Sequence, residues 1–209
     1  MLATQKARRL LSGFLVAALC VSAVAWSRRS RAEAMTDSGL QSRAKGPAGA
    51  KVLLTEFSDF QCPSCRYARP IVEELLKQYD GKVRFVFRHY PLNQHSRARD
   101  AALAAECAAR QGKFWAMHDL LFDKQDEWTN APDLGAQFAG YAQTAGLDAG
   151  SFAACISRPD TMSAVDRDVR EGDAWQVTST PTLFVGHRRL AGARQIQLYG
   201  PGLIETLLK

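Results

Sequence analysis

The chain has 209 residues, of which 46% are apolar, so it is long enough to bury a core without support from a disulfide or a metal. Its formal net charge is +6 at pH 7, and the first 34 residues alone contribute +5 of this excess. The rest of the chain is nearly neutral, which argues against a nucleic-acid-binding protein, because such proteins carry a basic face.

Residues 1–34 have the layout of an export signal, in which basic residues precede an apolar run over residues 10–26. As a helix this run would extend roughly 25 Å, just short of a bilayer core of about 30 Å. The sequence therefore predicts a cleaved signal peptide or an uncleaved anchor. The rest of the chain is expected in the periplasm or at the outer face of the cytoplasmic membrane. Cys20 fits as one more apolar residue of the run.

The next residues predict a linker followed by a β–α–β unit. Residues 35–50 are small and polar, which is typical of a flexible linker. Residues 52–57 are rich in strand formers, and residues 62–79 carry apolar side chains at a helical spacing. Residues 82–90 alternate apolar and polar side chains, which predicts a second strand. A crossover helix places two such strands parallel.

The following 80 residues lack strand signals and predict five helices. The last of them has Asp160 as its candidate N-cap. A hairpin follows, with Gly186 and His187 in its turn, and a short helix closes the chain. The predicted helices cover residues 96–112, 113–125, 133–146, 148–157, 160–175 and 200–209, and the hairpin strands cover residues 180–186 and 188–192.

The sequence Cys62-Pro63-Ser64-Cys65 lies where the first strand passes into the first helix. Unpaired N–H groups and the helix dipole stabilise a thiolate at this position, and the thiolate is the reactive form of cysteine. Cys62 is therefore expected to be the attacked sulfur and Cys65 the resolving one. A zinc site would need further ligands at short spacing, and a structural disulfide here would close too small a loop to stabilise much. Both stay as minor alternatives.

Four segments together resemble the DsbA-like thiol:disulfide oxidoreductases of the thioredoxin superfamily, over about residues 46–209. They are "EFSDFQCPSC", "FRHYPL", "AAECAARQGKFWAMHDLLF" and "STPTLFVG". The resemblance implies an α/β protein with a thioredoxin fold and an all-helical domain inserted between its halves. The domains would be residues 51–92 with 177–209 for the thioredoxin part, and residues 93–176 for the insert.

The resemblance also implies roles for residues outside the cysteine pair. Pro181 would be a cis-proline facing the cysteines, and it would leave the backbone of Thr180 free to pair with an extended client. Glu56 would lie beneath the site and help to move the proton of Cys65, unless it faces solvent. Asp59 and His89 are expected to be structural or loop residues.

Cys107 and Cys155 fall on the inward faces of two predicted helices. In an oxidising compartment, two unpaired thiols in the core would be a liability. We therefore predict a structural disulfide between them, with two separate buried thiols as the alternative. In the chain-entropy model, closing a loop of this length contributes at most about 4 kcal/mol.

The resemblance points to a protein-dithiol oxidase that accepts electrons from a client thiolate through a mixed disulfide at Cys62. Its expected partners are exported proteins with free thiols and a membrane quinone-linked protein that reoxidises it. A monomer without a prosthetic group is expected, and nucleic acid is not. Three alternatives stay open: a reductase or isomerase of the same fold, a glutathione-dependent enzyme, and a non-enzymatic chaperone or peptide-binding module.

Overall fold

The computed structural model describes residues 41–209, and Leu40–Lys209 form one compact unit. The predicted leader, with its apolar run over residues 10–26, lies outside the described residues. Within the described part of the chain, no helix combines the length and the apolar character that crossing a bilayer requires.

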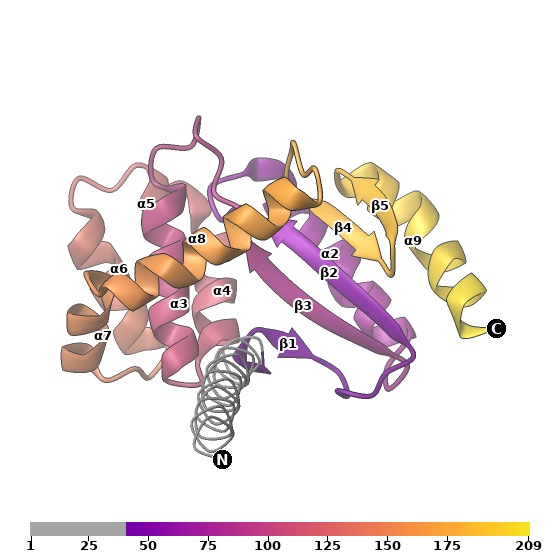
Figure 1. Cartoon of the computed structure of the whole chain (residues 1–209). Helices are drawn as coiled ribbons and strands as arrows, with labels where there is room; N and C mark the ends of the chain where they lie inside the picture. Colours follow the sequence, from indigo (N-terminus) through magenta and orange to yellow (C-terminus); the bar gives the residue numbers. More distant parts are fainter. Residues whose placement is uncertain (1–40) are drawn as a thin grey trace, which may run out of the picture. The chain divides into compact units, whose positions relative to one another are not determined.

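The predicted α/β fold class is confirmed. A five-stranded sheet has the order β1-β3-β2-β4-β5, in which β2 and β3 are parallel and every other pair is antiparallel. Six helices stand in the chain between β3 and β4 (Figure 1). The strands are β1 (Ala44–Lys45), β2 (Val52–Ser58), β3 (Val83–His89), β4 (Thr182–Val185) and β5 (Arg188–Ala191). The helices are α2 (Pro63–Gln78), α3 (Ala98–Arg110), α4 (Phe114–Asp123), α5 (Gln125–Thr129), α6 (Leu134–Thr144), α7 (Ala149–Ile156), α8 (Pro159–Ala174) and α9 (Ala193–Leu208).

The linker predicted over residues 35–50 contains a short strand that belongs to the fold. Ala44 and Lys45 form β1, which pairs antiparallel with Val86 and Phe85 of β3. Just before it, the buried Arg43 forms ion pairs with side chains of α3 and α8. A short polar segment can therefore be part of the fold when a buried countercharge holds it.

Two layers of helices enclose the sheet. In Figure 1, α8 crosses one face of the sheet and α2 lies behind the other, with α9 packed beside α2. The approach of α8 requires a glycine, because a Cβ at Gly172 would lie 2.6 Å from the ring of Tyr90. On the opposite face, the buried side of α2 packs against the strands through one stripe of residues. That stripe is Cys65, Ala68, Val72 and Leu75.

Three helix boundaries differ from those predicted. Arg158 is the N-cap residue of α8 and Pro159 is its first helical residue, so Asp160 lies in the first turn, where it pairs with arginines. The predicted helix over residues 113–125 is divided into α4 and α5 at Lys124. The last helix begins at Ala193 rather than Gly200, and Pro201 lies inside it.

Candidate active site

Cys62 lies at the start of α2, where the turn after β2 delivers it. It is the N-cap residue, with extended backbone angles (φ −76°, ψ 120°), and Pro63 occupies the first helical position as predicted. The sulfur of Cys62 lies 3.4 Å from the carbonyl oxygen of Thr180, which comes from the loop before β4. The fold thus brings together two segments that are 118 residues apart in the chain.

The surroundings of Cys62 favour its thiolate. The pKa of Cys62 is lowered to about 6, chiefly because the Cys65 thiol is a hydrogen-bond donor to its sulfur. Partial burial opposes this change, while the Thr180 side chain and the backbone N–H groups of Ser64 and Cys65 add to it. The sulfur is therefore largely ionised at neutral pH, as expected of a reactive cysteine at a helix N-terminus.

We expect the alkylation rate of Cys62 in the reduced protein to follow a titration with a midpoint near pH 6. In the Cys65→Ala variant the midpoint should move upward, because the largest cause of the lowered pKa is lost. Iodoacetamide labelling across a pH series, read by mass spectrometry, gives both midpoints. An unchanged midpoint in the variant would show that Cys65 is not what stabilises the Cys62 thiolate.

Cys65 has the opposite character. It is 1% exposed, and its sulfur accepts a hydrogen bond from the backbone N–H of Asp59 at 3.4 Å. Burial raises the pKa of Cys65 well above its ordinary value, and the neighbouring Cys62 sulfur and the Glu56 carboxylate raise it further. One sulfur of the pair is therefore held as a thiolate while the other is held as a thiol, which is how an acid and a base are distinguished in one site.

Glu56 lies on the face of β2 that points toward α2, and it is buried. Burial raises the pKa of Glu56 to about 7, although the nearby Ser58 hydroxyl opposes this effect. Glu56 and Cys65 line one cavity of about 20 Å³, which is large enough for a single water molecule. A carboxyl group that titrates near neutral pH is thus placed beside a sulfur that has to gain and lose a proton.

We expect Glu56→Gln to stabilise the reduced protein at alkaline pH. Because the folded-state pKa of Glu56 is raised to about 7 from 4.5, the native state binds the proton more tightly, and the wild type loses stability as the pH rises through this window. The variant should be more stable by about 3 kcal/mol above pH 8, with little difference below pH 4.5. Urea unfolding at both pH values measures the gap, and a gap that does not depend on pH would contradict a buried titrating carboxyl.

Thr180 and Pro181 lie opposite the cysteine pair, and the peptide bond between them is cis. The carbonyl of Pro181 accepts a hydrogen bond from the N–H of Gly192 at 2.8 Å, which ties this loop to the start of α9. The Thr180 hydroxyl is buried, and the Thr180 side chain helps to lower the pKa of Cys62. Through the Thr180 carbonyl, this loop contacts the Cys62 sulfur.

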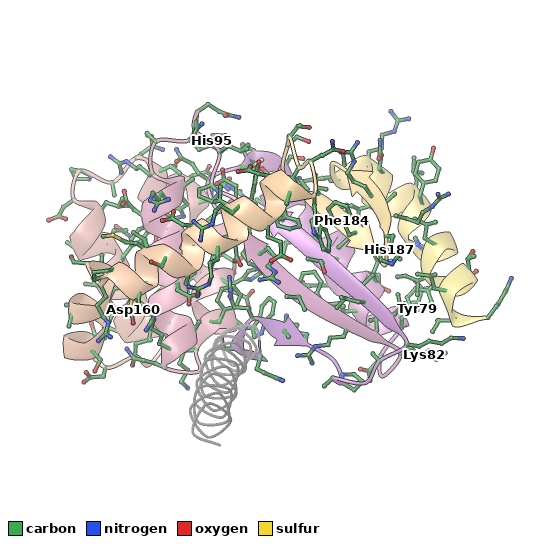
Figure 2. The ribbon with its side chains drawn as sticks, in the orientation of Figure 1. Tyr79, Lys82, His95, Asp160, Phe184 and His187 are labelled. Atoms are coloured by element: carbon green, nitrogen blue, oxygen red, sulfur yellow. A yellow bond between two sulfur atoms is a disulfide. The ribbon has the colours of Figure 1, made fainter. Side chains whose placement is uncertain are left out.

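Polar side chains hold the active-site turn in place, and they include Asp59, for which the sequence predicts a structural or loop role. The buried Asp59 accepts hydrogen bonds from the N–H groups of Gln61 and Leu92 and contacts Nδ1 of His95 at 2.7 Å. From α5, the side chain of Gln125 donates to the carbonyls of Phe60 and Cys62 at 2.7 and 3.1 Å. In Figure 2, His95 lies near the upper edge of the view, and Lys82, just before β3, lies at the lower right.

His89 lies in a buried charge cluster rather than at the sulfurs. Its ring Nε2 is 3.7 Å from the Glu106 carboxylate, and its backbone N–H donates to Asp168. Asp168 also binds Arg43 and Arg88. Burial lowers the pKa of His89, which favours the neutral imidazole.

Cys107 and Cys155 form a disulfide with an S–S distance of 2.06 Å, which links α3 to α7. Both residues are buried. The two sulfurs of the first motif, Cys62 and Cys65, are free thiols in the structure.

With this geometry in view, comparisons with known proteins identify the family. A family model described as Thioredoxin matches residues 39–199, which is well over half of the chain. The chain belongs to the thioredoxin family. Its fold is that of the DsbA-like members, as the sequence resemblance implied.

Solved structures share this thioredoxin fold. BdbD from Bacillus subtilis, in its oxidised form, has a TM-score of 0.70 and 24% identity, covering 79% of this chain and 92% of that chain. The alpha-DsbA1 of Wolbachia pipientis has a TM-score of 0.68 and 22% identity, covering 79% of this chain and 89% of that chain. At these identities the likeness establishes the fold.

Curated relatives of this thioredoxin-family chain are longer proteins. The match to the Na(+)/H(+) antiporter NhaA 3 of Salinispora tropica has 37% identity and covers 88% of this chain and 31% of the relative. The match to the Na(+)/H(+) antiporter NhaA of Herminiimonas arsenicoxydans has 35% identity and covers 71% of this chain and 23% of the relative. The chain therefore spans about a third or less of the relatives named here.

Proposed function

We propose that this chain is a protein thiol:disulfide oxidoreductase that works as an oxidase on exported proteins. A client thiolate attacks the Cys62 sulfur of the Cys62–Cys65 disulfide, and Cys65 leaves as a thiolate that takes up a proton. The client's second thiolate then attacks the client sulfur of the mixed disulfide, and Cys62 leaves as a thiolate. The client gains a disulfide, and the enzyme keeps the two electrons as a dithiol.

The observation that carries this proposal is the opposite character of the two sulfurs at the start of α2. Cys62 has a pKa lowered to about 6, while burial keeps Cys65 a thiol. A stabilised Cys62 thiolate is a good leaving group, and it stabilises the reduced form of the pair. Both effects favour transfer of the disulfide to a client.

Two neighbouring groups support the same chemistry. The Thr180 backbone beside Cys62 is suited to pairing with an extended client strand by strand addition. The carboxyl group of Glu56, with a pKa near 7, is suited to supplying and removing the Cys65 proton. We assign the pair Cys107 and Cys155 a structural role, because both are buried and distant in sequence from the reactive motif.

We place the enzyme at or beyond the outer face of a cytoplasmic membrane. The apolar run over residues 10–26 supports export or anchoring, and relatives of this domain are parts of proteins named as antiporters, which reside in membranes. Our proposed reoxidant is a quinone-linked membrane protein. For the domains, we propose a thioredoxin part made of residues 51–92 and 177–209, with residues 93–176 as the helical insert. We propose no antiporter activity for this chain.

The test is the equilibrium of the Cys62–Cys65 pair with glutathione buffers of known composition, followed by mass spectrometry of trapped thiols. A potential near about −120 mV supports the oxidase, whereas one near about −270 mV would assign the chain to the reductases. A pair that never exchanges with glutathione would remove redox chemistry from the protein altogether.

A further inference from the structure

The cavity beside Cys65 is bordered by a histidine that has no role in the proposed disulfide exchange. His118 lies on α4 and is buried. It lines the same water-sized cavity as Glu56 and Cys65. The cavity is thus bordered by a thiol, a carboxyl group and an imidazole, which come from three different elements of the fold.

The hydrogen bond between the His118 ring and Asp119 determines which ring nitrogen is left to accept a proton. Nδ1 lies 2.8 Å from the Oδ1 of Asp119, so it donates its proton to that carboxylate. Nε2 has no hydrogen-bond partner among the described residues and is left as an acceptor. Burial lowers the pKa of His118, while Asp119 opposes this effect by stabilising the imidazolium. The ring is therefore neutral at rest, and its charged form has a fixed partner.

Asp119 connects this ring to the solvent. Its side chain is 46% exposed, and it lies 3.5 Å from the guanidinium of Arg69. The other charged groups that border the cavity are Lys45 and Glu73, in addition to Arg69 and Glu56. Lys45 lies over the ring of Trp115 at 4.2 Å. A proton that reaches Nε2 from the cavity can thus leave through Nδ1 toward an exposed carboxylate.

A second buried histidine provides an internal comparison. Phe60, Phe87 and Phe114 surround both rings, and their centroids lie 5.3–5.9 Å from His118 and 5.4–6.0 Å from His89. His89 does not line the cavity and faces Glu106 instead. The two histidines therefore share three aromatic neighbours, although His118 also packs against Trp115 and Phe122. They differ in that only His118 lines the cavity beside Cys65.

We propose that His118, paired with Asp119, is a positioning residue that relays the Cys65 proton between the cavity and the solvent. When the pair is reoxidised, Cys65 loses its proton to the cavity, Nε2 of His118 takes up one proton, and Nδ1 releases one toward Asp119 and water. Cys65 can then attack the mixed disulfide at Cys62 as a thiolate. The same steps run in reverse when Cys65 leaves as a thiolate. Over a full cycle of oxidation and reduction, the proton released in one half is therefore taken up in the other. This inference rests on the proposed disulfide exchange.

The experiment is quenched-flow oxidation of the reduced protein by glutathione disulfide at a series of pH values. The reaction is stopped with acid, and mass spectrometry measures the species present. The first step forms the Cys62–glutathione mixed disulfide, and the second is its resolution by Cys65. In His118→Phe, which keeps an aromatic ring, we expect the first step to be unchanged and the second to slow by about 10- to 100-fold. The mixed disulfide should then accumulate, and the pH profile of the second step should shift. Added imidazole should restore the rate in His118→Ala.

The controls separate a proton relay from a packing role. His89→Phe removes an imidazole from the same aromatic surroundings, and its resolution step should match the wild type. Asp119→Asn changes a half-exposed side chain without loss of packing, and it should slow resolution in the same direction as His118→Phe. Equal slowing in the His89 and His118 variants, or an unchanged pH profile in both His118→Phe and Asp119→Asn, would overturn the inference. A wild type that forms no mixed disulfide at all would instead overturn the proposed function.

Discussion

Replacement of Cys62 by serine is expected to lower the rate of disulfide exchange with a client dithiol by at least about 10³-fold. A serine hydroxyl is not ionised near neutral pH, so neither attack on Cys62 nor its departure as a thiolate can occur. The measurement is the appearance of the client disulfide, followed by loss of free thiols, with the oxidised wild type and the variant at equal concentrations. Cys107→Ala/Cys155→Ala is the matched control, because it also removes sulfur but leaves the reactive pair intact.

The same variant decides between an enzyme and a binding module. If the chain is a chaperone that only holds extended peptides beside Thr180, then Cys62→Ser should keep its full effect on client folding. If the chain is an oxidoreductase, peptide binding should survive in the variant while disulfide transfer is lost. Full disulfide transfer by the Cys62→Ser variant would rule out the assignment of Cys62 as the attacked sulfur.

The largest expected loss of stability comes from the buried charge cluster. The carboxylate of Asp168 binds Arg43, accepts from Arg88 at 2.9 Å and accepts from the His89 N–H at 2.9 Å. Asp168→Asn would leave buried guanidinium charge without its main partner. We expect the free energy of unfolding to fall by about 3–5 kcal/mol at neutral pH, measured by urea denaturation.

Asp166→Asn is the matched control, two residues away on the same helix. Asp166 pairs with Arg99 at 2.7 Å, but the two side chains are 41% and 48% exposed. This change should cost at most about 1 kcal/mol. Equal losses in the two variants would show that burial does not determine the value of these pairs.

The effect of Asp168→Asn should also depend on pH. Burial alone would raise the pKa of Asp168, but the charges of Arg43 and Arg88 outweigh burial and lower it. A carboxyl group with a lowered folded-state pKa stabilises the protein above its unfolded-state pKa, and this contribution is lost as the pH falls through the folded-state value. The difference in the free energy of unfolding between the variant and the wild type should therefore become smaller at acidic pH.

The sequence was sufficient to predict those helices and strands in which the spacing of apolar residues matches the buried face. The alternation of Val83, Phe85 and Phe87 predicted β3, and its side chains are indeed buried. The helical spacing of apolar residues that predicted α2 included Tyr67, whose side chain is 64% exposed. The helix was therefore predicted correctly, although Tyr67 does not face the core. β1 has no such pattern, because an edge strand of only two residues is too short to show a periodicity.

For the active site, the sequence alone indicated where the reactive residues lie in the fold. It did not indicate which side chains surround them. The helix N-terminus at Cys62 and the proline before β4 follow from local signals that the structure reproduces. Among the neighbours of Cys65, the family resemblance implied Glu56 but not His118 or Lys45, because those two come from segments whose contacts are set by tertiary packing. The periodicity of α4 indicates that His118 faces inward with Phe114 and Leu121, yet it cannot indicate which side chain lies opposite.

The position of Arg43 affects where the protein can be cut. A recombinant fragment that begins at Lys51, just before the first long strand, would lack both Arg43 and β1. Asp168 would then lose a buried partner, and the backbone of β3 at Phe85 and Val86 would become a bare sheet edge, which invites pairing with other chains. Truncation at this site is therefore a route to aggregation, and material for crystallisation is better started near residue 41.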